Sequence, residues 1–257
     1  MAILGGMKHI LGPLLALLAF ALPASAADDG ILIFGATGRS GSELAKQLVA
    51  RGEKVTAFVR ATSNREPLAG VKVDYAVGDA TKAEDVAAAF KGKSYRVVIE
   101  AVQSRRGEPT PYEATVANIV PLAKQSGVKQ VIMYSTVAVD HTPTDMPQFP
   151  WGLYPEVVKQ QTAAEHKLRE SGVGYTIIRI GALLTSRDKP PHPPTGKSML
   201  TEDQLKFGAT TYGDLVAQTA ACVDAARCMN KVFVIADDSL AGEMCRMRAK
   251  DPAKDCP

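Results

Sequence analysis

A glycine-rich turn between a strand-like run and a helix-like run most limits how this chain can fold. The apolar run Ile31-Leu-Ile-Phe34 leads into Gly35-Ala-Thr-Gly38-Arg-Ser-Gly41, and residues 42–49 then follow a helical pattern. Glycine lets a backbone turn sharply and approach a ligand closely, and the N–H groups at a helix start attract phosphate. The pattern therefore predicts a buried parallel strand, a tight turn and a helix whose start binds a dinucleotide.

The spacing of these glycines is Gly-x-x-Gly-x-x-Gly, which differs from the more common Gly-x-Gly-x-x-Gly because Ala36 and Thr37 separate the first two. A glycine triplet by itself also occurs in ordinary loops. The strand before this triplet and the helix after it are the context that a dinucleotide site requires, so they favour the binding site.

Strand-like and helix-like runs alternate through the rest of the chain. Strands are predicted at residues 54–59, 71–77, 95–102, 130–134, 175–179 and 231–236, and helices at 81–90, 111–126, 155–171 and 212–226. Continuous apolar strands separated by helices are typical of a parallel sheet covered on both faces. We therefore predict the α/β class: a Rossmann-like, doubly wound parallel sheet in a single domain over residues 27–236.

Two segments fall outside this alternation. Residues 185–197 are loop-like around Pro190-Pro-His-Pro-Pro194, which predicts a proline-rich flap or binding lid. Residues 237–257 are charged and contain cysteines, and we expect them to form a peripheral tail.

The first residues resemble a targeting segment. Lys8 and His9 precede an apolar run over residues 10–22, and Ala24-Ser-Ala26 follows. This order is typical of a secretory signal peptide, so we expect removal of residues 1–26 and export to the periplasm, the medium or a lumen. The run is too short to span a membrane comfortably, so no transmembrane domain is expected after cleavage. The alternatives are an uncleaved anchor or a misassigned start.

All four cysteines lie late in the chain, at Cys222, Cys228, Cys245 and Cys256. An even number in an exported protein favours disulfides, and four cysteines allow three connectivities. We expect Cys222–Cys228 and Cys245–Cys256, although the sequence does not fix the pairing and idle thiols are the alternative. No Cys-x-x-Cys or neighbouring histidine has the spacing of metal ligands, so no metal site is expected.

The net charge and the hydrophobic content limit which classes of partner the chain can bind. The net charge is +3, which is too small to favour nucleic acid or an anionic membrane surface, and 46% hydrophobic residues suffice for a substantial core. We therefore expect a small-molecule substrate of unknown identity, no nucleic acid, and a protein partner only as an open alternative.

A basic residue follows the second predicted strand. Arg60 lies 25 positions beyond Gly35, close to the interval at which NAD sites carry an acidic residue for the ribose hydroxyls. A guanidinium cannot accept a hydrogen bond from a 2′-hydroxyl, but it pairs well with a 2′-phosphate. We therefore expect NADP(H) rather than NAD(H), with Arg39 and Arg65 adding charge. The alternative is that Arg60 is an ordinary solvated arginine.

Several short motifs occur together in one order. They are Gly35-Ala-Thr-Gly38-x-x-Gly41, Val59-Arg60, Gly78-Asp79-Ala80, the run from Gly127 to Ser135-Thr136, and the run from Glu165 to Arg179. In this order the chain resembles the atypical short-chain dehydrogenases of the NAD(P)H-binding, NmrA-like type, which include flavin- and biliverdin-reductase-like members. The resemblance covers residues 31–236 and implies a Rossmann core with a substrate cleft over the carboxyl edge of the sheet.

The resemblance also implies the place of each cofactor contact. The pyrophosphate would be held by Gly35, Thr37, Gly38, Arg39 and Gly41, and the 2′-phosphate by Arg60. Asp79 would accept the adenine amino group, unless it caps the following helix. The nicotinamide ribose would lie beside Ala101, Val102 and Gln103, and Ser135 would stand at the position of the family's active-site hydroxyl.

The catalytic pair of the family is incomplete here. Short-chain dehydrogenases normally use Tyr-x-x-x-Lys, in which the lysine lowers the tyrosine pKa and holds the ribose. Lys159 matches the lysine by its spacing to Glu165, but Pro155 stands four positions before it and Tyr154 is one residue too early. We expect Lys159 to hold the cofactor, Tyr154 to be a displaced candidate acid, and Ser135 to be the remaining hydroxyl.

Two functions stay open at this point. The first is a reductase that transfers hydride from NADPH to a small carbonyl, quinone or conjugated substrate. The second is a non-catalytic protein that binds NADP(H) for sensing or assembly, which the displaced tyrosine favours. Glu100 is also unexpected in an apolar strand, where it lies either at a solvated edge or near the cleft as an additional carboxylate.

Overall fold

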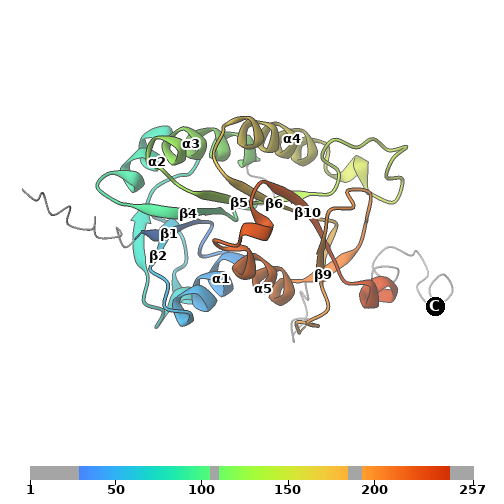
Figure 1. Cartoon of the computed structure of the whole chain (residues 1–257), viewed down its shortest axis with the longest axis horizontal. Helices are drawn as coiled ribbons and strands as arrows, with labels where there is room; N and C mark the ends of the chain where they lie inside the picture. Colours follow the sequence, from blue (N-terminus) through green and yellow to red (C-terminus); the bar gives the residue numbers. More distant parts are fainter. Residues whose placement is uncertain (1–28, 105–109, 185–192, 244–257) are drawn as a thin grey trace, which may run out of the picture.

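A mostly parallel sheet of eight strands forms the centre of the protein (Figure 1). The computed structural model describes residues 29–104, 110–184 and 193–243. The strand order is β3-β2-β1-β4-β5-β6-β10-β8, in which only β8 runs antiparallel to its neighbour. These strands are β1 Gly30–Phe34, β2 Val55–Val59, β3 Asp74–Val77, β4 Tyr95–Glu100, β5 Gln130–Thr136, β6 Tyr175–Ile180, β8 Met199–Thr201 and β10 Lys231–Ala236. A separate parallel pair consists of β7 Ala182–Leu184 and β9 Ala209–Thr211.

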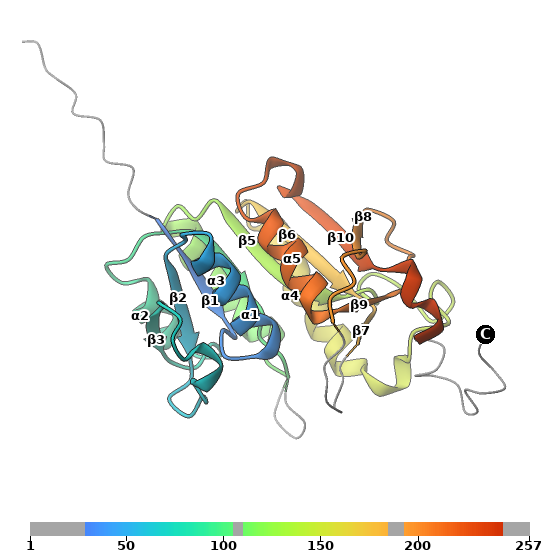
Figure 2. The ribbon, with the colours of Figure 1, turned by 90° about the horizontal axis from the view of Figure 1, so that it is seen from below.

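Helices cover both faces of the sheet. On one face α1 Arg39–Ala50 and α5 Tyr212–Cys222 lie side by side, as Figure 2 shows. The other face carries α2 Ala83–Phe90, α3 Tyr112–Gln125 and α4 Pro155–Glu170. Short 3-10 turns are η1 Glu66–Leu68, η2 Trp151–Leu153, η3 Ala226–Cys228 and η4 Asp238–Leu240.

The alternation of side chains along each buried strand explains the two cores. In β1, Ile31 and Ile33 belong to the core under α1 and α5, whereas Leu32 and Phe34 belong to the core under α2, α3 and α4. Successive side chains of a strand point to opposite faces, so a strand buried on both sides is apolar at most of its positions. The predicted doubly wound α/β fold is therefore confirmed.

Several element boundaries differ from the prediction. The third strand is shorter than residues 71–77, and α5 ends at Cys222 rather than at 226, because Val223 is already extended. The short strands β7, β8 and β9 had no counterpart in the prediction. Asp237 and Leu240, which the prediction placed in a peripheral tail, are buried.

The Cys222–Cys228 disulfide is present and joins the end of α5 to η3. Cys245, Cys256, the expected signal peptide and the centre of the proline-rich flap lie outside the described residues. Within the ranges that are described, no helix is long and apolar enough to cross a membrane.

The strand order places a cleft at one point of the sheet. The chain moves outward from β1 through β2 to β3, then returns to the other side of β1 to begin β4. The loops that leave β1 and β4 therefore diverge, and in open α/β sheets ligands bind at this point of divergence. The glycine turn follows β1, and Ala101 follows β4, so both lie at this point.

Candidate dinucleotide site

The glycine turn packs directly against the segment that follows β4. Gly35 has a φ of +78°, and a Cβ atom built on it would lie 2.5 Å from the carbonyl oxygen of Ala101. A Cβ atom on Gly41 would meet the carbonyl oxygen of Gly35. The turn can close this tightly only because these positions lack side chains. Because these glycines have no side chains, a ligand can approach the backbone of the turn closely.

The start of α1 suits an anion. Gly38 is the N-cap, so no side chain caps the first N–H groups, and the first turn of this fully described helix contains no acidic residue. The N–H of Gly38 donates to Gly35 O at 2.9 Å, which fixes the turn. An uncapped helix start with a positive dipole end is a phosphate site, so these residues fit a dinucleotide pyrophosphate.

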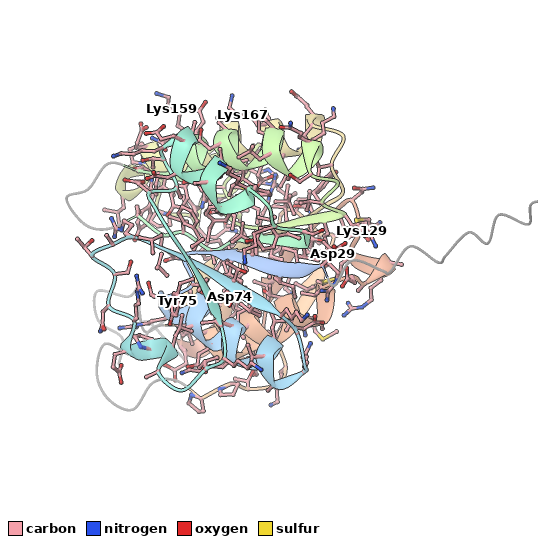
Figure 3. The ribbon with its side chains drawn as sticks, turned by 90° about the vertical axis from the view of Figure 1, so that its left-hand side faces the viewer. Asp29, Asp74, Tyr75, Lys129, Lys159 and Lys167 are labelled. Atoms are coloured by element: carbon pink, nitrogen blue, oxygen red, sulfur yellow. A yellow bond between two sulfur atoms is a disulfide. The ribbon has the colours of Figure 1, made fainter. Side chains whose placement is uncertain are left out.

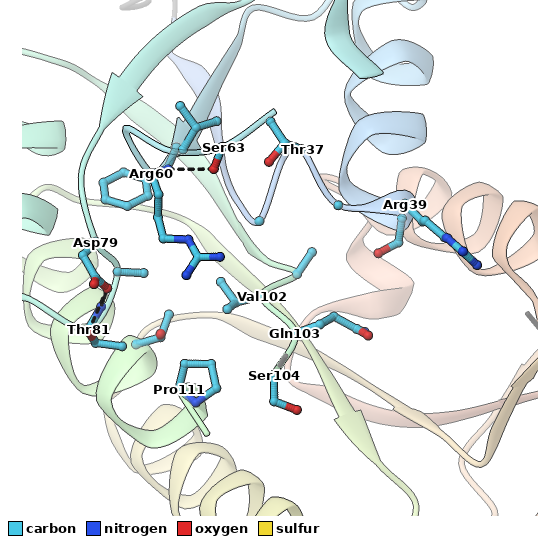
Figure 4. A pocket seen from close by; sticks show the side chains of 18 of the residues that line it. Thr37, Arg39, Arg60, Ser63, Asp79, Thr81, Val102, Gln103, Ser104 and Pro111 are labelled. Carbon is cyan, nitrogen blue, oxygen red and sulfur yellow. Dashed lines mark hydrogen bonds between the residues drawn. The ribbon is translucent and has the colours of Figure 1, made fainter. Parts of the chain in front are cut away.

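A cleft of 770 Å³ opens above the turn (Figure 4). Its lining includes all of the expected cofactor contacts except Gly41 and Lys159, namely Gly35, Thr37, Gly38, Arg39, Arg60, Asp79, Ala101, Val102 and Gln103. Gly41 is not among the lining residues because it lies under the turn, against the backbone of Gly35. The volume falls within the range of small-molecule and cofactor sites.

Arg60 points into the cleft from the end of β2 (Figure 4). Its N–H donates to the Ser63 hydroxyl at 3.1 Å, and the Ser63 N–H donates back to Arg60 O at 2.9 Å. This turn fixes the backbone from which the guanidinium extends. Ser63 also lines the cleft, so it can donate to the same anion as Arg60.

Asp79 also lines the cleft, at the same end as Arg60 (Figure 4). Its Oδ1 accepts from the N–H of Thr81 at 2.9 Å and from the Thr81 hydroxyl at 2.7 Å. These bonds lower the pKa of Asp79, with smaller contributions from the charges of Lys82 and Arg60. The N-cap of α2 is Lys82, so Asp79 is not the helix cap. Asp79 is therefore an ionised acceptor in the cleft wall.

Other basic residues divide between the cleft and the surface. The Arg39 guanidinium lies 5.8 Å from the ring centre of Tyr212, at the start of α5, and both residues line the cleft. Arg65 lies over the ring of Tyr75 at 4.7 Å and is not among the lining residues. Arg65 therefore does not add to the charge around Arg60 as the sequence suggested.

Ser63 and Tyr212 are lining residues that the sequence analysis missed. Ser63 could have been found from its position three residues after Arg60, which is typical of a tight turn. Tyr212 gave no local signal, since only the packing of α5 beside α1 brings it to the glycine turn.

The candidate catalytic residues do not converge on the cleft. Ser135 is 4% exposed near the end of β5, and its Oγ has no hydrogen-bond partner among the described residues. Tyr154 is 47% exposed at the N-cap of α4, with its ring 6.3 Å from that of Phe149. None of Ser135, Tyr154 and Lys159 is among the lining residues.

Lys159 requires a correction. Its side chain is 78% exposed and lies 4.0 Å from Glu156, and Figure 3 shows it on the outer side of α4. The buried face of α4 is formed by Gln161, Ala164, Glu165 and Leu168. With 3.6 residues per turn, Lys159 lies about 170° around the axis from the centre of that face. The expectation that it holds the nicotinamide ribose does not fit this position.

Known proteins resemble this chain in sequence and in fold. Residues 35–225 match a family described as NAD(P)H-binding. An uncharacterized chloroplastic protein of Arabidopsis thaliana is 27% identical over 203 residues, which cover 74% of this chain and 70% of that protein.

Two solved structures share the fold. One is ChuY of Escherichia coli O157:H7, described as an anaerobilin reductase: TM-score 0.70, 22% identity, covering 82% of this chain and 98% of that one. Another is a short-chain dehydrogenase/reductase from Veillonella parvula in complex with NADP: TM-score 0.62, 19% identity, covering 82% and 95%. With the family match over most of the domain and the cleft built around the glycine turn, the chain belongs to the NAD(P)H-binding family.

Proposed function

We propose that the protein is an NADPH-dependent reductase acting on a small carbonyl, quinone or conjugated substrate. The observation that supports it best is Arg60, which points into the cleft where an NAD site needs an acidic residue. The bound dinucleotide would supply the hydride. Around it, the start of α1 binds the pyrophosphate, Arg60 and Ser63 bind the 2′-phosphate, and Asp79 accepts from the adenine.

The test is consumption of NADPH, followed by absorbance, with a panel of quinones, flavins and aldehydes. Consumption with at least one acceptor, and much slower consumption of NADH, is the expected result. Tight NADPH binding without consumption by any acceptor would contradict the reductase. That outcome would instead support the second candidate, a non-catalytic NADP(H)-binding protein, which the exposed positions of Tyr154 and Lys159 favour.

Arg60→Ala is expected to weaken NADP binding by roughly ten- to a hundred-fold and to change NAD binding little. A hydrogen bond to a charged group contributes about 1.5–3 kcal/mol, and only NADP carries the 2′-phosphate. Titration calorimetry with both dinucleotides measures this. Lys159→Ala is the control, because it removes an exposed cation outside the cleft and should change neither affinity. Equal losses for NADP and NAD in Arg60→Ala would argue against the 2′-phosphate contact.

We also propose that the protein is exported. The proposal is supported by the signal-like order of residues 1–26 and by the Cys222–Cys228 disulfide, since disulfides persist mainly in oxidising compartments. Intact mass of the protein from its native host should correspond to a chain that begins at Ala27 and contains oxidised cysteines. A full-length mass with four alkylatable thiols would contradict export.

A further inference from the structure

Three buried side chains near the cleft each have a polar atom without a hydrogen-bond partner among the described residues. Glu100 is 0% exposed, Thr115 is 0% exposed and Ser135 is 4% exposed. Among the described residues, Glu100 Oε2, Thr115 Oγ1 and Ser135 Oγ have no hydrogen-bond partner. Buried polar atoms nearly always bind something, because leaving them unpaired costs free energy. Three such atoms therefore indicate a place that takes polar groups from outside the protein chain.

The three side chains lie in the same layer. Glu100 on β4 pairs in register with Met133 on β5, and paired residues of parallel strands point to the same face. Met133 packs in the core under α3 and α4, and Ser135 follows it by two positions on the same face. Thr115 comes from the buried side of α3, which covers this face. Of the two positions that the sequence left open for Glu100, the solvated edge is therefore excluded and the position near the cleft remains.

This layer adjoins the cleft. Glu100 Oε1 accepts from the N–H of Val102 at 3.0 Å, so the carboxyl group folds toward the segment that leaves β4. Val102 and Thr115 both line the cleft. The carboxyl group is therefore separated from the cleft by the residues of its wall, on the side where the resemblance places the nicotinamide ribose.

The surroundings of Glu100 keep its carboxyl group neutral. Burial raises the pKa of Glu100 to about 8, and the hydrogen bond from Val102 only partly opposes this. On β5, Tyr134 is also buried, which raises its pKa, and it donates or accepts a hydrogen bond with Thr219. Arg179, which faces Ser135 from β6, is paired with Glu165 of α4. No described cation is paired with Glu100, so at neutral pH it carries a transferable proton.

We propose that Glu100 is the proton source of this reductase and acts through the Thr115 hydroxyl, which lines the cleft, and one water molecule bound by Glu100 and Ser135. The proposal rests on the reductase function stated above. When the substrate carbon receives hydride, the oxygen or carbon conjugated to it gains negative charge. Thr115 gives its proton to that atom and regains one from the water, which takes the proton of Glu100. Glu100 is left as a carboxylate and is reprotonated by solvent, so each turnover consumes one hydride and one proton.

The first measurement is independent of turnover. Carbon NMR of protein labelled at the glutamate carboxyl groups should show one resonance that titrates near pH 8 and is missing in Glu100→Gln. Glu113→Gln is the matched control, because this carboxylate on α3 is half-exposed and pairs with Lys167, so its removal should leave that resonance in place. A Glu100 resonance that titrates in the ordinary range for glutamate would overturn the proposal.

The second measurement is the pH profile of hydride transfer. In the wild type kcat should fall about tenfold per pH unit above pH 8, whereas Glu100→Gln should lower kcat by roughly a hundred-fold and lose this dependence. Thr115→Val should have a similar effect, and the double variant of Thr115 and Glu100 should be no slower than either single variant, because both act in one relay. Affinity for NADPH should be unchanged in all three.

The outcomes separate the two proposals. If wild-type protein transfers hydride and Glu100→Gln keeps the same rate and pH profile, the assignment of Glu100 as proton source is wrong, whereas the proposed reductase function is supported. If wild-type protein is folded and binds NADPH but reduces no acceptor, the proposed reductase function is wrong, and the role of Glu100, which rests on it, is wrong too.

Discussion

Gly35→Ala is expected to abolish dinucleotide binding and to lower the free energy of unfolding by roughly 2–5 kcal/mol. Part of this cost is backbone strain, because Gly35 has a φ of +78°, where a Cβ atom costs about 1–2 kcal/mol. The rest is steric, because the new Cβ would lie 2.5 Å from Ala101 O and push the β4 loop away. Denaturant unfolding and calorimetry with NADPH measure the two effects.

Gly52→Ala separates the strain from the steric clash. Gly52 follows α1 with a φ of +87°, but no atom lies within 4 Å of a Cβ built there. It should therefore show only the strain of about 1–2 kcal/mol and bind NADPH normally. If both variants lost the same stability and neither lost binding, the close approach of the turn to Ala101 would have no functional consequence.

The order of strands and helices could be predicted because it depends on local patterns. A strand buried on both faces, such as β1, is apolar at most of its positions, and each long helix has a polar outer face. The strands β7, β8 and β9 could not be predicted, since each has three residues and is defined by its partner. β7 pairs with β9 across a proline-rich excursion, and no local period reports such pairing.

The candidate site could be predicted only in part, for the same reason. The glycine turn and Arg60 are read from spacing along one β-α-β unit, and both line the cleft. The prediction for Lys159 rests on its spacing to Glu165, and spacing does not show which side of α4 faces the sheet. The burial pattern of α4 in the structure shows this side, because Glu165 and Leu168 are buried and Lys159 lies opposite them. The sequence shows that Glu100 is unusual in an apolar strand, but only the register with β5 shows which face of the sheet it lies on.

A buried ion pair connects β6 to α4, near Ser135. Arg179 is 3% exposed and Glu165 is 0% exposed. The guanidinium donates to both carboxylate oxygens, at 3.0 Å from Nε to Oε1 and 2.8 Å from Nη2 to Oε2. It also donates to Asp140, in the loop after β5, at 3.2 Å. One side chain of β6 thus fixes α4 and the loop that follows Ser135.

Arg179→Met is expected to lower the free energy of unfolding by about 3–5 kcal/mol, because Glu165 is left buried without its charge partner. The double variant Arg179→Met/Glu165→Leu should recover much of this loss, since it replaces the pair with apolar groups of similar size. Urea unfolding of the three proteins measures the recovery. Arg169→Met is the control, because Arg169 also contacts Asp140 but is exposed, so its loss should cost less than about 1 kcal/mol. If the double variant were no more stable than Arg179→Met, the cost would lie in the lost packing and the Asp140 contact rather than in the unpaired carboxylate. The loop after β5, and with it Ser135, would then depend on Arg179 itself.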